Sequence, residues 1–140
     1  MRARPAGTML DPTMSVVGSH RAGPDDSVLV LHLPAALDVT ATGPVLDEVA
    51  GRLPRVPGAG LVADLSAVVL INSMGITCLL QVLEECRVRG VGMVLAAASA
   101  GIERFFRQLK LDEKFELAAT VDQAVARLSR GGGLGRATGA

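Results

Sequence analysis

The sequence has no tryptophan or tyrosine and only three phenylalanines in its 140 residues. Proteins that bind single-stranded nucleic acids stack the bases on aromatic side chains, so this composition argues against such a role. Charge of one sign is also not in excess, because 14 Lys and Arg residues balance 14 Asp and Glu residues. We therefore expect neither a nucleic acid nor an anionic membrane surface as the partner.

Cysteine and histidine are equally scarce, with two of each. Cys78 and Cys86 are eight residues apart on one predicted helix, about 12 Å at 1.5 Å per residue, which is too far for a disulfide. We expect both to be reduced thiols in the core. His20 and His32 have no metal-ligand partner at a recognisable interval, so the sequence predicts no metal and no other cofactor.

One uncharged run, from Leu65 to Leu83, is long enough on length alone to cross a bilayer. Asn72, Ser73 and Gly75 lie in its middle, and the hydrophobic period changes there, which favours a strand followed by a helix. No secretory signal is predicted, because the N-terminal residues contain Pro and Gly instead of an apolar segment. We expect a cytoplasmic protein without direct membrane insertion.

The chain is of a length typical of one domain. Residues 1–13 and 131–140 show no apolar periodicity, and we expect a disordered leader and a flexible Gly-rich tail around a folded domain over 14–130. Strands are predicted at 14–18 and 27–33, which form a hairpin, and at 60–65, 91–97 and 115–118. A first helix is predicted after Asp38, with Thr40 and Thr42 near its start, Pro44 in its first turn and its end before Pro54. Further helices are predicted over 74–89, after Ser99 and after Thr120.

Strands that alternate with helices over short links indicate an α/β fold with a mostly parallel sheet of four or five strands and about four helices. The best marked helix is the one over 74–89, where Gly90 is a C-cap glycine. Its predicted apolar face consists of Ile76, Leu79, Leu80 and Leu83. The helix after Ser99 carries a similar stripe, which we expect in the core: Ile102, Phe105, Phe106 and Leu109.

The most informative stretch is 64–75, which reads Asp-Leu-Ser-Ala-Val-Val-Leu-Ile-Asn-Ser-Met-Gly. An apolar run of the kind found in parallel strands stops here at a short polar cluster that opens a helix. In open α/β sheets, ligands and partners bind beyond the carboxyl ends of the strands. The functional surface is therefore predicted around residues 72–75.

This stretch resembles the signature of the STAS family, which includes anti-sigma factor antagonists and a domain of sulfate transporters. The family pattern is roughly Asp-Leu-Ser-x-Val-x-x-Ile-Asp-Ser-Ser/Thr-Gly. Leu37-Asp38 and the segment from Val94 to Ala124 resemble further blocks, so the likeness covers about residues 15–129. It implies a single STAS-type domain that is not an enzyme and that binds an anti-sigma factor, often a serine kinase. In the family, phosphorylation of the hydroxyl residue before the glycine ends that contact.

Two residues of the signature differ here. Met74 stands at the phosphoacceptor position, and a thioether cannot accept a phosphoryl group. Asn72 stands where the family usually has Asp, which removes a negative charge. Ser73 is the one hydroxyl left at 72–75, and it is either a helix N-cap or a displaced phosphorylation site. We expect no phosphorylation switch of the family type.

The predicted partner-binding residues are Asp38, Asn72, Ser73, Met74 and Gly75. Asp38 is either a turn or cap residue or a contact, and Met74 either packs inward or makes an exposed apolar contact. The leading interpretation is a regulatory module that binds an anti-sigma factor or kinase and so controls transcription. The alternative is an accessory subunit of a transporter or a stress-signalling assembly, with a homodimer left open. No phosphate-binding or nucleophile motif supports an enzyme.

Overall fold

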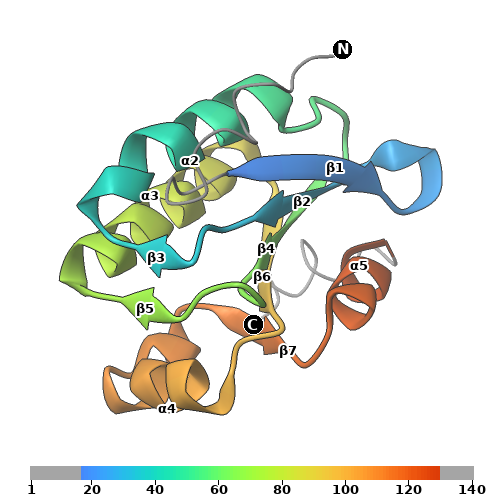
Figure 1. Ribbon diagram of the computed structural model, residues 1–140. Helices are drawn as coiled ribbons and strands as arrows, with labels where there is room; N and C mark the ends of the chain where they lie inside the picture. Colours follow the sequence, from blue (N-terminus) through green and yellow to red (C-terminus); the bar gives the residue numbers. More distant parts are fainter. Residues whose placement is uncertain (1–16, 130–140) are drawn as a thin grey trace.

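The computed structural model describes residues 17–129, so the predicted leader (1–13) and tail (131–140) lie outside the described residues. Five strands form the main sheet, in the spatial order β1-β2-β4-β6-β7 (Figure 1). They are β1 (Gly18–Ala22), β2 (Val28–His32), β4 (Gly60–Asp64), β6 (Gly92–Ala96) and β7 (Glu116–Ala118). β1 is antiparallel to β2 and every other pair is parallel, so the predicted α/β fold with an N-terminal hairpin is confirmed.

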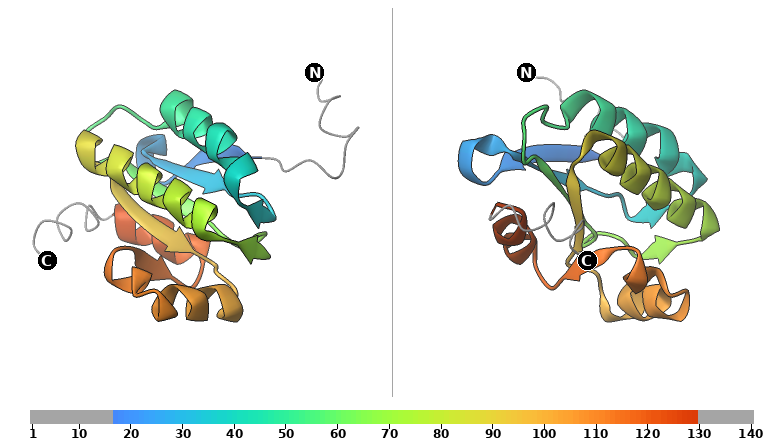
Figure 2. Two further views of the ribbon diagram at one scale, coloured as in Figure 1. Left: turned by 90° about the vertical axis from the view of Figure 1, so that its left-hand side faces the viewer. Right: turned by 180° about the vertical axis from the view of Figure 1, so that it is seen from behind.

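Helices cover both faces of this sheet. α2 and α3 lie side by side over one face, and α5 lies on the opposite face (Figures 1 and 2). The four α-helices in the described part of the chain are α2 (Val39–Arg52), α3 (Ser73–Arg89), α4 (Ala100–Gln108) and α5 (Val121–Ser129). Two short 3-10 helices, η1 (Pro24–Asp26) and η2 (Leu111–Glu113), complete the connections.

The central strands are buried on both sides, which explains their continuous apolar sequence. In β2, Leu29 and Leu31 point into the larger core beneath α2 and α3. Val28 and Val30 point into a smaller core beneath α5. Cys78 and Cys86 are buried free thiols of α3, as predicted.

Two very short strands stand apart from the main sheet. β3 (Ala36–Leu37) and β5 (Leu70–Ile71) pair with each other in parallel. The sequence did not reveal them, because two residues are too few to show a period of two. β3 leads into α2 and β5 leads into α3, so this small sheet brings the two helix N-termini together (Figure 1).

The structure corrects two predictions near the N-terminus. Residues 14–16 of the first predicted strand lie outside the described residues, and the strand that the structure describes is Gly18–Ala22, because the hairpin turn sets a register in which Ala22 pairs with Val28 and Gly18 with His32. Pro44 lies inside α2 and not in its first turn, because this helix begins directly after the cap at Asp38. Inside a helix, proline removes one backbone hydrogen bond.

The predicted inward faces of α3 and α4 are also partly wrong. Leu80 and Leu83 are only partly buried, and the inner face of α3 consists of Gly75, Ile76, Cys78, Leu79, Val82 and Cys86. The small residues Gly75 and Cys78 let the helix approach the core on that side, and a count of leucines misses this effect. In α4, Ile102 and Phe106 are buried, Phe105 is partly buried, and the C-cap residue Leu109 is 49% exposed.

The corrected register of α3 is testable with two neighbouring leucines. Leu79 is fully buried, so Leu79→Ala should lower the free energy of unfolding by about 2–5 kcal/mol. Leu80→Ala is the matched control and should cost about 1 kcal/mol. Because the chain lacks Trp and Tyr, urea unfolding is best followed by circular dichroism. Equal losses for the two variants would contradict this register.

Candidate functional site

Asp38 caps the N-terminus of α2. Its carboxylate accepts hydrogen bonds from the Thr40 hydroxyl and from the Thr40 backbone N–H, the latter at 3.0 Å. These bonds, that of the hydroxyl first, lower the pKa of Asp38. The cap interpretation of Asp38 is therefore correct, and its ionised carboxylate lies beside the positive end of the helix dipole.

Asn72 caps the neighbouring helix, α3. Its side-chain oxygen accepts hydrogen bonds from the backbone N–H groups of Met74 and Gly75, both at 3.1 Å. Of the two alternatives for Ser73, the helix N-cap is therefore wrong, and Ser73 is the exposed first residue of the helix. Asn and Asp are equally good caps, so Asn at this position keeps the helix start without the negative charge.

Gly75 fixes how closely the two helix starts approach. A Cβ atom on Gly75 would lie 2.0 Å from the backbone oxygen of Leu37 in β3. The same oxygen accepts a hydrogen bond from the backbone N–H of Asn72 at 3.4 Å. Gly75 is buried, so it serves this site as a packing contact between α3 and β3.

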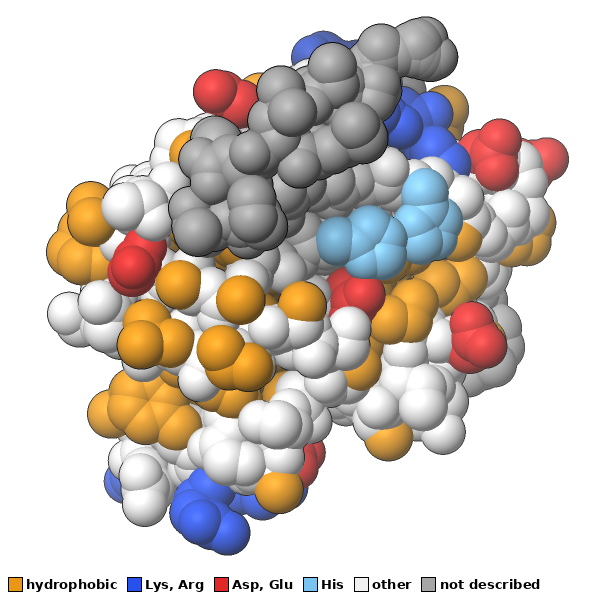
Figure 3. Space-filling model, in the orientation of Figure 1, with side chains coloured by type: hydrophobic (Ala, Val, Ile, Leu, Met, Phe, Trp, Pro, Cys, Tyr) orange, Lys and Arg blue, Asp and Glu red, His pale blue; other side chains and the backbone are white. Residues whose placement is uncertain are grey.

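An exposed apolar surface lies over these two helix starts. It consists of Val39, Val69, Leu70 and Met74, which are 60%, 80%, 50% and 44% exposed, and we call it the β3–β5 patch. Figure 3 shows hydrophobic side chains gathered over β3 and β5. Of the two alternatives for Met74, the exposed one holds. The sequence pattern did not indicate the exposure of Val39, Val69 and Leu70, because an apolar residue in an apolar run is normally expected in the core.

Asp64, the first residue of the signature, holds the turn that follows β4. Its carboxylate accepts a hydrogen bond from the Ser66 backbone N–H at 3.0 Å and lies 2.9 Å from His32 Nδ1. Partial burial opposes ionisation of Asp64, but the hydrogen bonds from Ser66 and His32 outweigh it and lower its pKa. Asp64 therefore stabilises the turn that leads from β4 toward β5.

The thiols of this domain are poorly reactive. Burial raises the pKa of Cys78, and it raises the pKa of Cys86 to about 12. A thiol is nucleophilic as its thiolate, which these environments disfavour. Over residues 17–129, no group of three or more His, Cys, Asp or Glu side chains could hold a metal ion. Over the same range, no helix is both long and apolar enough to span a bilayer.

A five-stranded, mostly parallel sheet with an N-terminal hairpin and two capped helix starts held by a small second sheet defines an α/β domain of the STAS type. The family model for the STAS domain matches residues 22–124, and the chain belongs to this family.

Solved structures give the same fold. An anti-sigma-factor antagonist (STAS) domain protein from Planctomyces limnophilus is 16% identical, with a TM-score of 0.69 over 83% of this chain and 99% of that chain. An anti-sigma factor antagonist from Mycobacterium paratuberculosis is 27% identical, with a TM-score of 0.55 over 81% of this chain and 94% of that one. The murine anion transporter Slc26a9 is 13% identical, with a TM-score of 0.68 over 89% of this chain and 24% of the transporter.

The contact of Gly75 with β3 predicts that this glycine tolerates no side chain. Gly75→Ala should lower the free energy of unfolding by about 3 kcal/mol, because the new methyl group meets backbone atoms. Gly51→Ala in α2 is the matched control, since a Cβ there meets nothing within 4 Å. It should raise stability by about 0.5–1 kcal/mol. A neutral Gly75→Ala variant would contradict the close approach.

Proposed function

We propose that this protein is a non-enzymatic regulatory binding module that docks an anti-sigma factor, or a kinase of that role, through the β3–β5 patch and thereby controls transcription. This function implies a cytoplasmic location. The observation that carries the proposal is the exposed apolar surface at the two capped helix starts. The similarity of the chain to anti-sigma factor antagonists supports the choice of partner.

The patch has the composition of an interface core. Its four apolar side chains come from three short segments, and exposed polar residues such as Thr40 and Ser73 lie next to them in the chain. An apolar centre with a polar rim is typical of protein–protein interfaces. Met74 adds a flexible side chain that adapts to a partner surface.

The patch is also preorganised. The caps at Asp38 and Asn72 hold the starts of α2 and α3, and the contact of Gly75 with Leu37 holds α3 against β3. A surface that is rigid before binding loses less conformational entropy in the complex. We therefore assign Asp38, Asn72 and Gly75 to shaping the surface, and Met74, Leu70, Val69 and Val39 to contacting the partner.

The same geometry supports a constitutive binder. A phosphate in this patch would place about two negative charges among apolar side chains, but the acceptor position holds Met74. Ser73 is one residue earlier, about 100° around the helix axis. Phosphoryl transfer depends on the position of the nucleophile, and a misplacement of about 1 Å already costs on the order of a hundredfold.

A second candidate is an accessory subunit of a transporter or a stress-signalling assembly. It rests on the missing hydroxyl at Met74 and on the likeness to part of an anion transporter. It uses the same patch with a different partner. Binding to a purified anti-sigma factor kinase distinguishes the two candidates.

Met74→Asp should weaken binding to the cognate anti-sigma factor, measured by calorimetry, at least about tenfold, because it places a charge in the apolar centre of the contact. Val88→Asp is the matched control, since Val88 is also exposed and lies near the other end of α3. It should bind like the wild type. Equal losses in both variants would argue against docking at the β3–β5 patch.

The chain should gain no phosphate when it is incubated with the cognate kinase and ATP and analysed by intact mass. Met74→Ser combined with Asn72→Asp restores the family signature and should yield one phosphate per chain. A stoichiometric phosphate on the wild type that disappears in Ser73→Ala would make Ser73 a phosphorylation site. If the kinase does not phosphorylate the double variant, this result would favour the accessory-subunit function.

A further inference from the structure

The only two histidines of the sequence lie against each other on the surface of the β1–β2 hairpin. His20 Nδ1 is 2.8 Å from His32 Nε2, and the ring centroids are 4.9 Å apart. Figure 3 shows the two imidazoles side by side, with an acidic side chain next to them. The interval of 12 residues in the sequence gave no sign of this contact.

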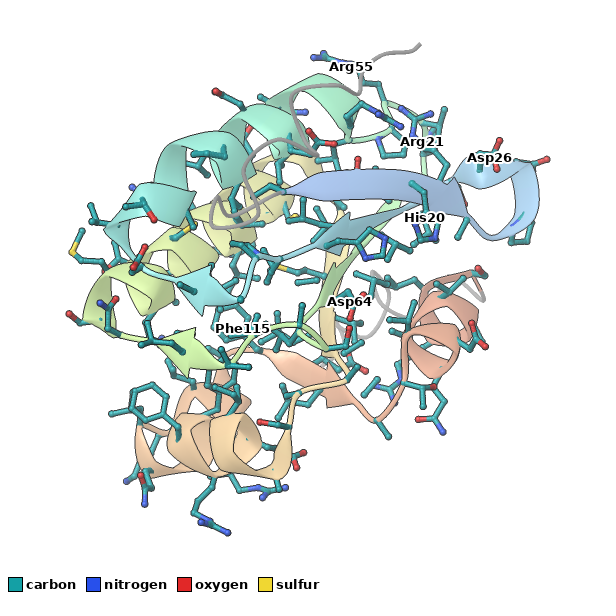
Figure 4. The ribbon with its side chains drawn as sticks, in the orientation of Figure 1. His20, Arg21, Asp26, Arg55, Asp64 and Phe115 are labelled. Carbon is teal, nitrogen blue, oxygen red and sulfur yellow. The ribbon has the colours of Figure 1, made fainter. Side chains whose placement is uncertain are left out.

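The strand register explains why the histidines meet. His32 lies directly opposite Asp64 across the parallel β2–β4 pair, and His20 lies opposite Val30 across the hairpin. Side chains two residues apart on a strand share a face, so His20 and His32 lie on the face of Val30. Val30 belongs to the core beneath α5. The histidines and Asp64 therefore share that face, and Figure 4 shows where His20 and Asp64 lie relative to each other.

The hydrogen bonds assign the protons of His32. One oxygen of Asp64 accepts the Ser66 backbone N–H, and the other lies 2.9 Å from His32 Nδ1. A carboxylate accepts hydrogen bonds, so we assign the His32 proton to Nδ1. The Nε2 atom of neutral His32 then carries a lone pair and faces His20. A carboxylate that holds one ring nitrogen while the other faces outward is the usual arrangement of a metal-binding histidine.

We propose that His20 Nδ1 and His32 Nε2 together bind one divalent transition-metal ion, with Asp64 as the positioning residue of His32. Two nitrogens at about 2.0–2.1 Å from an ion and at a right angle to each other are about 2.9 Å apart. The observed 2.8 Å between Nδ1 and Nε2 is close to that separation. Imidazole nitrogens are good ligands for Cu²⁺ and Ni²⁺, which bind most tightly among the divalent first-row ions.

The ion replaces the proton that His20 shares with His32. That proton moves through solvent to Nε2 of His20, which frees the Nδ1 lone pair. Both rings then turn away from the hydrogen-bonded arrangement, in which the two nitrogens face each other, so that both lone pairs aim at the ion. No third protein ligand is available within residues 17–129, so water completes the coordination. His20 is exposed and the side chain of His32 is 43% exposed, so the ion enters from solvent.

Such an ion would tie β1 to β2 and stabilise the folded chain by mass action. None of its ligands belongs to the β3–β5 patch, so this site does not rest on the proposed function.

The test uses the full chain without a polyhistidine tag. Titration with Ni²⁺ and Cu²⁺ should show one ion per chain and a metal-dependent rise in the melting temperature. His20→Asn and His32→Asn should each weaken binding by about a hundredfold, because each converts a two-point contact into a one-point contact. The double variant should bind no ion at this position, because it lacks both ligands. Equal affinity of the wild type and His20→Asn would overturn the proposal. This variant decides the question even if His32→Asn fails to fold, since His20 is exposed on an edge strand.

Two further measurements separate a built site from adventitious binding. Electron paramagnetic resonance of the Cu²⁺ complex should show two imidazole nitrogens in the wild type and one in His20→Asn, and one nitrogen in the wild type would also overturn the proposal. Asp64→Asn keeps an oxygen for the Ser66 N–H but turns an amide NH₂ toward His32, which favours the wrong tautomer. It should weaken binding about 10- to 100-fold. Unchanged affinity in this variant would refute the positioning role of Asp64.

Discussion

The contact between Gly75 and the carbonyl of Leu37 constrains the end of the domain where α2 and α3 begin, since a single added carbon at Gly75 would lie 2.0 Å from that oxygen. α3 can therefore begin directly against β3, and β5, which leads into α3, pairs with β3 at the same place. The two helix starts, their caps at Asp38 and Asn72 and the exposed side chains beside them all depend on this approach. It is a steric constraint, because the allowed distance depends only on the absence of a side chain.

The caps and the apolar side chains have different roles at this end of the molecule: the caps stabilise the helix starts, and the apolar side chains form the exposed surface. Asp38 and Asn72 satisfy backbone N–H groups that would otherwise lack partners, so the helix starts are stable without help from a ligand. The side chains that remain exposed next to them are apolar: Val39, Val69, Leu70 and Met74. The helix starts of this chain therefore present apolar side chains, and Met74 offers no hydroxyl among them.

The other polar cluster, His20, His32 and Asp64, follows from strand register. Asp64 belongs to the STAS signature, but its two oxygens serve the turn at Ser66 and the ring of His32. The same residue thus links the turn that leads toward β5 with the histidine pair on the β1–β2 hairpin. A short signature therefore carries structural roles in addition to the contact surface that its resemblance implies.

The sequence by itself determined the α/β class, the order of the main strands and helices, the N-terminal hairpin and the approximate start of α3, because apolar periodicity and turn residues are local signals. It also determined that Met74 carries no phosphate. Tertiary structure decided which face of α3 is buried, since Gly75 and Cys78 allow an approach that the leucines alone do not reveal. It also decided that Val39, Val69 and Leu70 are exposed and that His20 meets His32, because exposure and cross-strand contacts depend on segments far apart in the chain.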